Sequence, residues 1–198
     1  NMVQRAMRCA RDAKHVLGVT TGRHILDPLA EGSTHGLSYA ILPYCEPLSN
    51  NRLVWWVQRA LLRPRLFDWL WEATRLSVKN VVPAAFETVV ADPLRSVMAM
   101  SRLSSAIRFS AERALRGLEG GAWQPRHVLM HADLWKGNVL ISPPDAGERY
   151  QQHWSDRFVI IDWAGSRLDG YPLFDLVRLA HSMRLSARDR KSTRLNSS

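Results

Sequence analysis

Two short apolar runs, each beside a polar residue, constrain this chain more than any other feature. The first run, residues 139–142, directly follows Asn138, and the second, residues 158–161, directly precedes Asp162. Each run is too short for a helix, which predicts two buried strands. If these strands pair antiparallel, the start of the first lies opposite the end of the second. Asn138 and Asp162 then lie side by side.

A second carboxylate is expected at the same point. Asp133 lies five residues before Asn138, across a loop that contains Gly137, and can curl back toward it. Two carboxylates and an amide oxygen then converge, which are hard oxygen ligands suited to a magnesium ion that keeps waters and phosphate oxygens. One carboxylate is left over for a substrate hydroxyl.

Each of these residues also fits a purely structural role. Asp, Asn and Gly are the usual residues of tight turns, and Asp162 could be the N-cap of a helix that follows the strand. An unpaired charge directly after four apolar residues is costly, however. Its position therefore favours a cation or a set of hydrogen bonds at Asp162.

The spacing His131-x-Asp133-x-x-x-x-Asn138, followed by an apolar strand that ends at Asp162, resembles the catalytic core of the aminoglycoside phosphotransferase and choline kinase family. The downstream motif Gly-Tyr-Pro-Leu-Phe-Asp175 resembles a further element of that family, in which an Asp on the next helix holds the catalytic loop by its backbone. Three elements occur in the right order. The resemblance implies an α+β, protein-kinase-like fold with two lobes, the C-terminal lobe mostly helical around a catalytic β-hairpin.

The resemblance also implies ATP-dependent phosphorylation of a hydroxyl on a small molecule. Asp133 is expected to be the catalytic residue, which orients the hydroxyl and accepts its proton, while Asn138 and Asp162 hold Mg²⁺ on the ATP phosphates. His131 and Asp175 are expected to support the loop, with no proton-transfer role for His131. Asp175 lies only thirteen positions after Asp162, which leaves too little chain for the activation segment with which protein kinases dock peptides, so we expect a small-molecule acceptor.

The N-terminal part predicts a helix, two strands and a hinge. Residues 3–17 have apolar spacings of three and four, with Gly18 closing the helix. Residues 23–28 and 37–42 predict short strands joined by a turn-rich link. The next segment resembles the hinge between kinase lobes, where the Pro43 carbonyl and the Cys45 amide would bind the adenine of ATP. An ordinary strand-to-helix turn explains the prolines of this segment equally well.

The middle of the chain is interpreted as helical. Residues 50–77 predict a helix broken near Pro64, and Asp92 and Pro93 predict the start of one long helix with an apolar face that continues to Leu118 and ends at Gly120. A long helix that leads into the catalytic loop is typical of a kinase C-terminal lobe. We interpret four tryptophans of the first segment as packing residues: Trp55, Trp56, Trp69 and Trp71.

We expect residues 1–44 to be the remnant of a nucleotide-binding lobe with its hinge, and residues 45–190 to form an incomplete catalytic lobe. The glycine-rich loop and the ATP-binding lysine of the family should lie upstream of Asn1. We therefore interpret the chain as a fragment truncated at both ends, inactive when isolated. Residues 191–198 resemble a cloning or sequencing read-through and are predicted to be a non-native tail.

Composition excludes several other classes of protein. A chain of 198 residues with 46% hydrophobic content is expected to be globular. Its apolar runs are well short of the roughly 18 residues that a membrane helix needs, no leader is evident, and Cys9 and Cys45 set no disulfide framework. We expect a cytoplasmic protein without a membrane partner. Residues 1–24 and 184–198 carry +8 of the net charge of +9, so no nucleic-acid partner is expected.

Two alternative functions stay open. A ketosamine-type sugar kinase fits Asp133-Leu-Trp, although the sequence Ile-Asp162-Trp favours the aminoglycoside-type relatives. A pseudokinase that binds a nucleotide or a partner without turnover fits the first helix, where Asp12 is the only acid and the glutamate of the family is missing. An antibiotic, a choline-like alcohol, a sugar and a lipid-core sugar all fit as acceptors.

Overall fold

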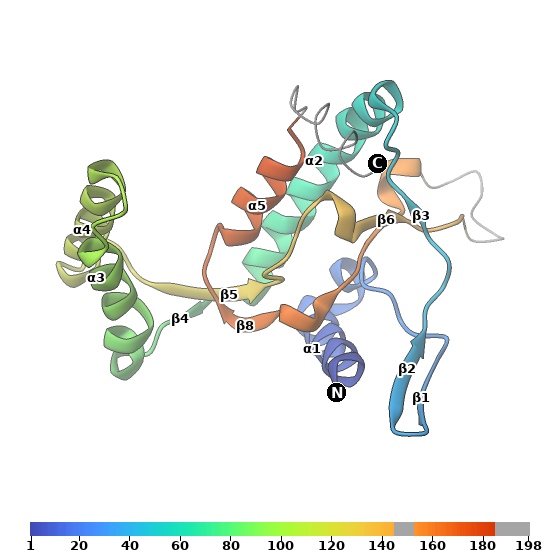
Figure 1. Ribbon diagram of the computed structural model, residues 1–198, viewed down its shortest axis with the longest axis horizontal. Coiled ribbons are helices and arrows are strands. Elements are labelled where there is room, and N and C mark those ends of the chain that lie inside the picture. Colours follow the sequence, from blue (N-terminus) through green and yellow to red (C-terminus); the bar gives the residue numbers. More distant parts are fainter. Residues whose placement is uncertain (145–152, 185–198) are drawn as a thin grey trace, which may run out of the picture. The chain divides into compact units, whose positions relative to one another are not determined.

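Figure 1 shows the computed structural model, which describes residues 1–144 and 153–184 and has a mixed α+β fold. The chain divides into two compact units, of which unit 1 comprises residues 1–77 and the chain from Leu129 onward, and unit 2 comprises Val78–Val128. The α+β class is confirmed. The predicted boundary at residue 44 does not coincide with this division. The predicted tail, residues 191–198, lies outside the described residues.

Unit 1 begins with α1 (Met2–Gly22), whose first turn is capped by the side chain of Asn1. The predicted end of the first helical segment at Gly18 is confirmed, because two helical segments meet at a kink there, and the second continues to Gly22. Gly18 interrupts the helix with φ 67° and ψ −175°, a conformation that glycine adopts without a steric penalty from Cβ. The glycine signal therefore marks a kink within α1.

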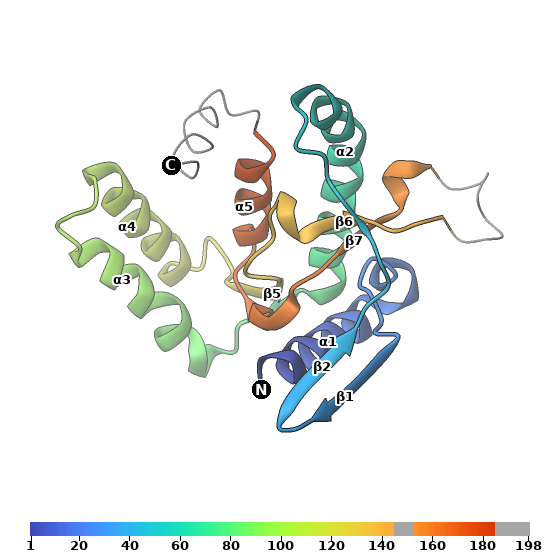
Figure 2. The ribbon, with the colours of Figure 1, turned by 45° about the vertical axis from the view of Figure 1, so that its right-hand side comes forward.

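A β-hairpin follows, formed by β1 (Ala30–Thr34) and β2 (Leu37–Ile41), and Figure 2 shows it beside α1. The turn consists of His35 and Gly36, which both have positive φ, as a type I′ hairpin turn requires. The strand predicted over residues 23–28 is wrong. The segment interpreted as a turn-rich link supplies most of β1 instead, because the hairpin is largely exposed and its first strand is polar.

The long helix α2 (Arg52–Ser77) starts after Asn51, whose side chain accepts hydrogen bonds from two backbone amides of the first turn. The predicted break near Pro64 is wrong, since the helix continues through the proline. Leu62 and Leu66, on either side of it, are fully buried. The packing of these two leucines offsets the free-energy cost of the backbone hydrogen bond that Pro64 cannot donate.

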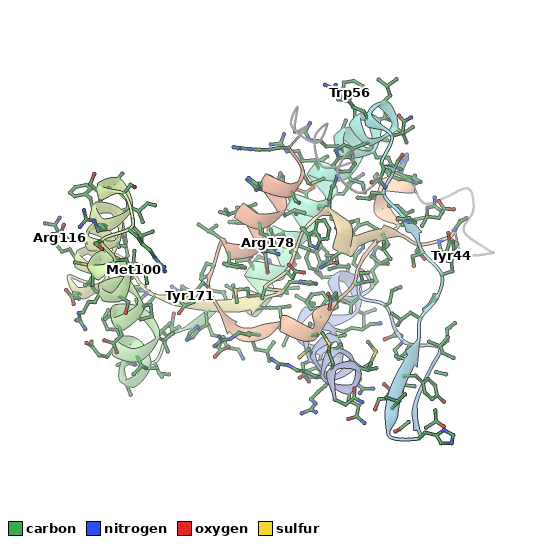
Figure 3. All side chains as sticks on the ribbon, viewed as in Figure 1. Tyr44, Trp56, Met100, Arg116, Tyr171 and Arg178 are labelled. Atoms are coloured by element: carbon green, nitrogen blue, oxygen red, sulfur yellow. The ribbon has the colours of Figure 1, made fainter. Side chains whose placement is uncertain are left out.

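Packing explains two of the four tryptophans of α2. Trp55 and Trp69 belong to the core of unit 1, whereas Trp56, labelled in Figure 3, and Trp71 are exposed.

None of the helices in the described residues is both long and apolar enough to cross a membrane. The largest fully buried side chains of the core come from segments on both sides of unit 2 in the sequence: Ile25, Leu62, Leu66, Leu134, Val139, Ile160, Leu179 and Met183.

A three-stranded antiparallel sheet lies at the centre of unit 1, in the order β3 (Glu46–Pro47), β6 (Val139–Ile141) and β7 (Phe158–Ile160). Val139 lies opposite Ile160, so the predicted pairing of the two apolar runs is confirmed, with each strand one residue shorter than expected. β8 (Arg167–Gly170) and α5 (Phe174–Ser182) complete the described part of the unit.

Unit 2 contains β4 (Lys79–Asn80), which pairs antiparallel with the start of β5 (Arg126–Met130), and two helices, α3 (Asp92–Ala99) and α4 (Ser105–Glu119). Short 3₁₀ and π-helical turns, Pro83–Ala85 and Glu87–Ala91, precede α3.

The single long helix predicted from Asp92 is wrong, because the chain leaves the helical conformation after Ala99 and Ser104 caps a second helix. The Ser104 hydroxyl accepts from an amide of the first turn of α4, as an N-cap serine does. Asp92 is not an N-cap, since the preceding π-helical turn leads directly into α3. The predicted end at Gly120 is confirmed.

Candidate active site

The candidate site lies in unit 1, where the loop between β5 and β6 meets the end of β7. The amide of Ile161 donates to the carbonyl of Asn138 over 3.0 Å. Asn138 and the residue before Asp162 are thus hydrogen-bonded neighbours at one end of the β6–β7 pair. Asp162 is exposed and adopts a left-handed backbone conformation, with φ 63° and ψ 59°. This conformation is uncommon for residues other than glycine, although Asp tolerates it better than most.

Asp133 curls back to Asn138, as the sequence predicts. The side-chain nitrogen of Asn138 donates to the backbone carbonyl of Asp133 over 2.9 Å and lies 3.2 Å from its carboxylate Oδ2. Asn138 is buried, so these contacts fix its amide group. Because the nitrogen makes both contacts, the side-chain oxygen of Asn138 faces away from Asp133.

Asp175, on the first turn of α5, holds the start of the loop by its backbone. Its Oδ2 accepts from the amide of His131 over 2.6 Å and its Oδ1 from the amide of Ala132 over 3.0 Å. This is the contact that the family resemblance implies for it. Ala132 has a positive φ of 70°, so the carboxylate stabilises a loop conformation that alanine rarely adopts. Burial raises the pKa of the Asp175 carboxyl, while the backbone hydrogen bonds act in the opposite direction.

His131 joins the loop to the end of β7. Its Nε2 lies 2.9 Å from the carbonyl of Ile161, so Nε2 carries the proton and donates it. Nδ1 then accepts from the amide of Asp133 over 3.3 Å. Both ring nitrogens are used by the backbone, and burial lowers the pKa of the His131 imidazole. This geometry supports the structural role predicted for His131.

An ion pair between Arg178 and Oδ1 of Asp133 was not predicted from the sequence. Arg178, labelled in Figure 3, lies on α5 one turn after Asp175. The two side chains are 46% and 41% exposed, respectively. A sequence signal exists: once Asp175 is assigned to the loop, the residue three positions later is placed on nearly the same face of the helix, near the same loop.

The predicted adenine segment precedes β3. Cys45 is buried and burial raises the pKa of its thiol, whereas Tyr44, labelled in Figure 3, is exposed. Glu46 pairs with Ile141 of β6, so the segment that carries Pro43 and Cys45 continues into a strand bonded to the one that follows Asn138. The backbone groups predicted to bind adenine and the side chains predicted to bind Mg²⁺ are therefore linked by one pair of strands.

The predicted magnesium ligands fit the chemistry of the ion. No group of three or more His, Cys, Asp or Glu side chains within residues 1–144 and 153–184 is arranged for a metal ion. The predicted site depends instead on the Asn138 amide oxygen, which the contacts with Asp133 do not use, and on the exposed carboxylate of Asp162. Both are hard oxygen donors of the kind that Mg²⁺ binds.

The comparisons with known proteins give no match that bears on the family resemblance. No family model matches the sequence, and neither a curated protein nor a solved structure is significantly similar to it.

Proposed function

We propose that this chain carries the catalytic loop of an ATP-dependent phosphotransferase that phosphorylates a hydroxyl of a small molecule. The observation that carries the proposal is the position of Asn138, which is hydrogen-bonded both to Asp133 and to the residue before Asp162. These are the residues that the aminoglycoside phosphotransferase and choline kinase resemblance assigns to catalysis and to metal binding. Their convergence supports one site with these roles.

In the proposed reaction the acceptor hydroxyl donates a hydrogen bond to the Asp133 carboxylate, which orients its oxygen toward the γ-phosphorus of ATP. The oxygen–phosphorus bond forms, the bond from the γ-phosphorus to ADP breaks, and the hydroxyl proton passes to Asp133. Asn138 and Asp162 would hold Mg²⁺, which neutralises charge on the phosphates when it is bound. The loop needs few further catalytic groups, since positioning supplies much of the rate.

The proposal includes a kinase-like, two-lobe arrangement. The α1 helix and the β1–β2 hairpin correspond to a nucleotide-binding lobe, and the backbone groups of Pro43 and Cys45 would bind the adenine. The pairing of β3 with β6 supports this assignment, because it joins the hinge segment to the strand that follows Asn138.

The test is the Asp133→Asn variant of the full-length natural protein, assayed by ADP release with a panel of hydroxyl acceptors. We expect kcat to fall by about 10²- to 10⁴-fold, the usual contribution of a positioned general base. Asp68→Asn, an exposed carboxylate on α2, is the matched control and should leave kcat unchanged. Unchanged turnover in Asp133→Asn, with a clean dependence on ATP, would refute the assignment.

The ion pair between Arg178 and Asp133 favours a second candidate, a pseudokinase that binds a nucleotide or a partner without turnover. In such a protein the pair would keep the carboxylate engaged permanently. ATP binding to the full-length protein without ADP release with any acceptor is the result that this candidate predicts. A ketosamine-type sugar kinase is distinguished from both candidates if ADP release is fastest with ketosamines, which are therefore included in the acceptor panel.

A further inference from the structure

The geometry points to an acceptor that carries a negatively charged group close to the hydroxyl that is phosphorylated, with Arg178 as the residue that selects it. This inference rests on the proposed function, because it concerns the substrate that Asp133 would meet. It narrows the acceptor class to hydroxy acids and phosphorylated alcohols or sugars.

The starting point is that both carboxylate oxygens of Asp133 are engaged. Oδ1 pairs with Arg178, and Oδ2 lies 3.2 Å from the side-chain nitrogen of Asn138. An acceptor hydroxyl must donate its proton to one of these oxygens. One of the two present donors therefore has to move or share its oxygen when the acceptor binds.

Arg178 is the donor that can leave. Asn138 is buried and is held by a second hydrogen bond, 2.9 Å long, to the backbone carbonyl of Asp133. The Arg178 side chain is 46% exposed, and ion pairs with this exposure contribute little free energy. Displacing Arg178 costs less than displacing the buried Asn138 side chain, which would also break its hydrogen bond to the backbone carbonyl of Asp133.

The displaced guanidinium is exposed to water, and an anionic group on the acceptor can replace Asp133 as its partner. Asp175 attracts Arg178 electrostatically, but it is buried and each of its oxygens already accepts from a backbone amide. An anionic group on the acceptor satisfies the guanidinium, which binds carboxylates and phosphates with two parallel hydrogen bonds. Asp133 is then free to accept from the hydroxyl of the same molecule.

A cationic acceptor meets the opposite situation. Its positive charge would lie beside Arg178, and like charges that approach closely without an intervening anion repel each other. A neutral alcohol that displaces Arg178 from Asp133 offers the guanidinium no anionic group in exchange. Aminoglycosides and choline, which are cationic, should therefore be poor acceptors, although the family that the motifs resemble is named after them.

The test measures ADP release by the full-length natural protein with acceptors of matched size and different charge. The panel contains glycerate, glycerol and serinol, followed by sugar phosphates with their parent sugars, and choline with aminoglycosides. We expect kcat/KM for the anionic member of the preferred set to exceed that of its neutral counterpart at least about tenfold. Cationic members should be the weakest.

The variant Arg178→Gln should raise KM for the anionic acceptor by about 10- to 100-fold, the value of a charge-assisted pair. KM for the neutral counterpart should not rise, because this variant has no guanidinium that the acceptor must displace from Asp133. Arg178→Lys keeps the charge without the two-pronged geometry and should be intermediate. Arg75→Gln, which removes an exposed guanidinium paired with Glu72 on α2, is the control and should change neither constant. Urea unfolding of each variant verifies that the fold is intact.

The outcomes separate this inference from the proposed function. No ATP turnover with any acceptor overturns both. Turnover that prefers neutral or cationic acceptors, or an Arg178→Gln variant with an unchanged KM for the anionic acceptor, overturns the inference and leaves the phosphotransferase proposal standing. A preference for the anionic member that disappears in Arg178→Gln supports it.

Discussion

The hydrogen bonds between Asp175 and the loop make a prediction that needs no substrate. In Asp175→Asn the side chain keeps its shape and loses its charge. Asn presents one oxygen, so it can accept from only one of the two amides, those of His131 and Ala132. Its nitrogen faces the other amide, donor against donor. One backbone N–H at the start of the loop between β5 and β6 is left without an acceptor.

The size of the effect follows from these contacts. A hydrogen bond to a charged group contributes about 1.5–3 kcal/mol, and leaving a buried donor unpaired costs about 1–3 kcal/mol. Removing a buried charge returns part of this loss, because burial raises the pKa of the Asp175 carboxyl and so disfavours its charged form. We expect a net decrease of about 2 kcal/mol in the free energy of unfolding.

Urea unfolding followed by tryptophan fluorescence measures this decrease on the 198-residue chain, and hydrogen exchange locates it. The amides of His131 and Ala132 should lose protection, one or both, while those of α2 change little. Asp169→Asn is the control, since Asp169 is exposed and pairs with Arg167 at the surface, where such pairs contribute at most about 1 kcal/mol. Equal stability of Asp175→Asn and the natural chain, with both amides still protected, would refute this reasoning.

Two further predictions concern stability. Ser77→Ala should destabilise the chain by about 1–3 kcal/mol in urea unfolding, because the buried Ser77 hydroxyl accepts from a backbone amide of β5 over 2.9 Å. The control Ser110→Ala removes only an exposed hydrogen bond within α4 and should change stability by less than about 0.5 kcal/mol. Stability should also fall as the pH drops below about 6.5, by up to about 1.4 kcal/mol per pH unit for each of His24 and His131. Burial lowers the pKa of both imidazoles in the folded chain, so below this pH the unfolded chain binds protons that the folded chain does not. Equal unfolding midpoints at neutral and mildly acidic pH would contradict this second prediction.

The β6–β7 hairpin could be predicted because its signal is local. Two apolar runs bounded by polar residues identify the strands, and antiparallel pairing then brings Asn138 close to Asp162. The hydrogen bond from Ile161 to Asn138 follows from this geometry. The hairpin is also the part of the fold on which the candidate site most depends.

Apolar spacing misled the prediction elsewhere. The apolar face that begins at Leu94 continues across residues 100–104, so the pattern alone does not reveal that Met100 is extended, although Ser104 offered an N-cap signal. Residues 23–28 were predicted to form a strand, yet only Ile25 makes a bridge, with Ile160. Ile25 is buried without belonging to a strand.

The ion pair between Arg178 and Asp133 joins residues 45 positions apart, so it can be predicted only after Asp175 has been assigned to the loop. It depends on α5 docking beside the loop, which Asp175 stabilises through its two backbone hydrogen bonds. Sequence reasoning proposed Asp133 as a site residue and overlooked Arg178, which pairs with its carboxylate.

The hydrogen bond between Ser77 and Leu129 has a consequence for how the chain could have been assembled. It joins the last residue before unit 2 to the first residue after it, so the two ends of the interruption in unit 1 lie next to each other. A segment that leaves and re-enters at neighbouring points can be exchanged, lengthened or replaced by a short linker with little distortion of its host. Val78–Val128 therefore has the connectivity of an inserted segment. Its sequence can diverge without displacing the loop between β5 and β6.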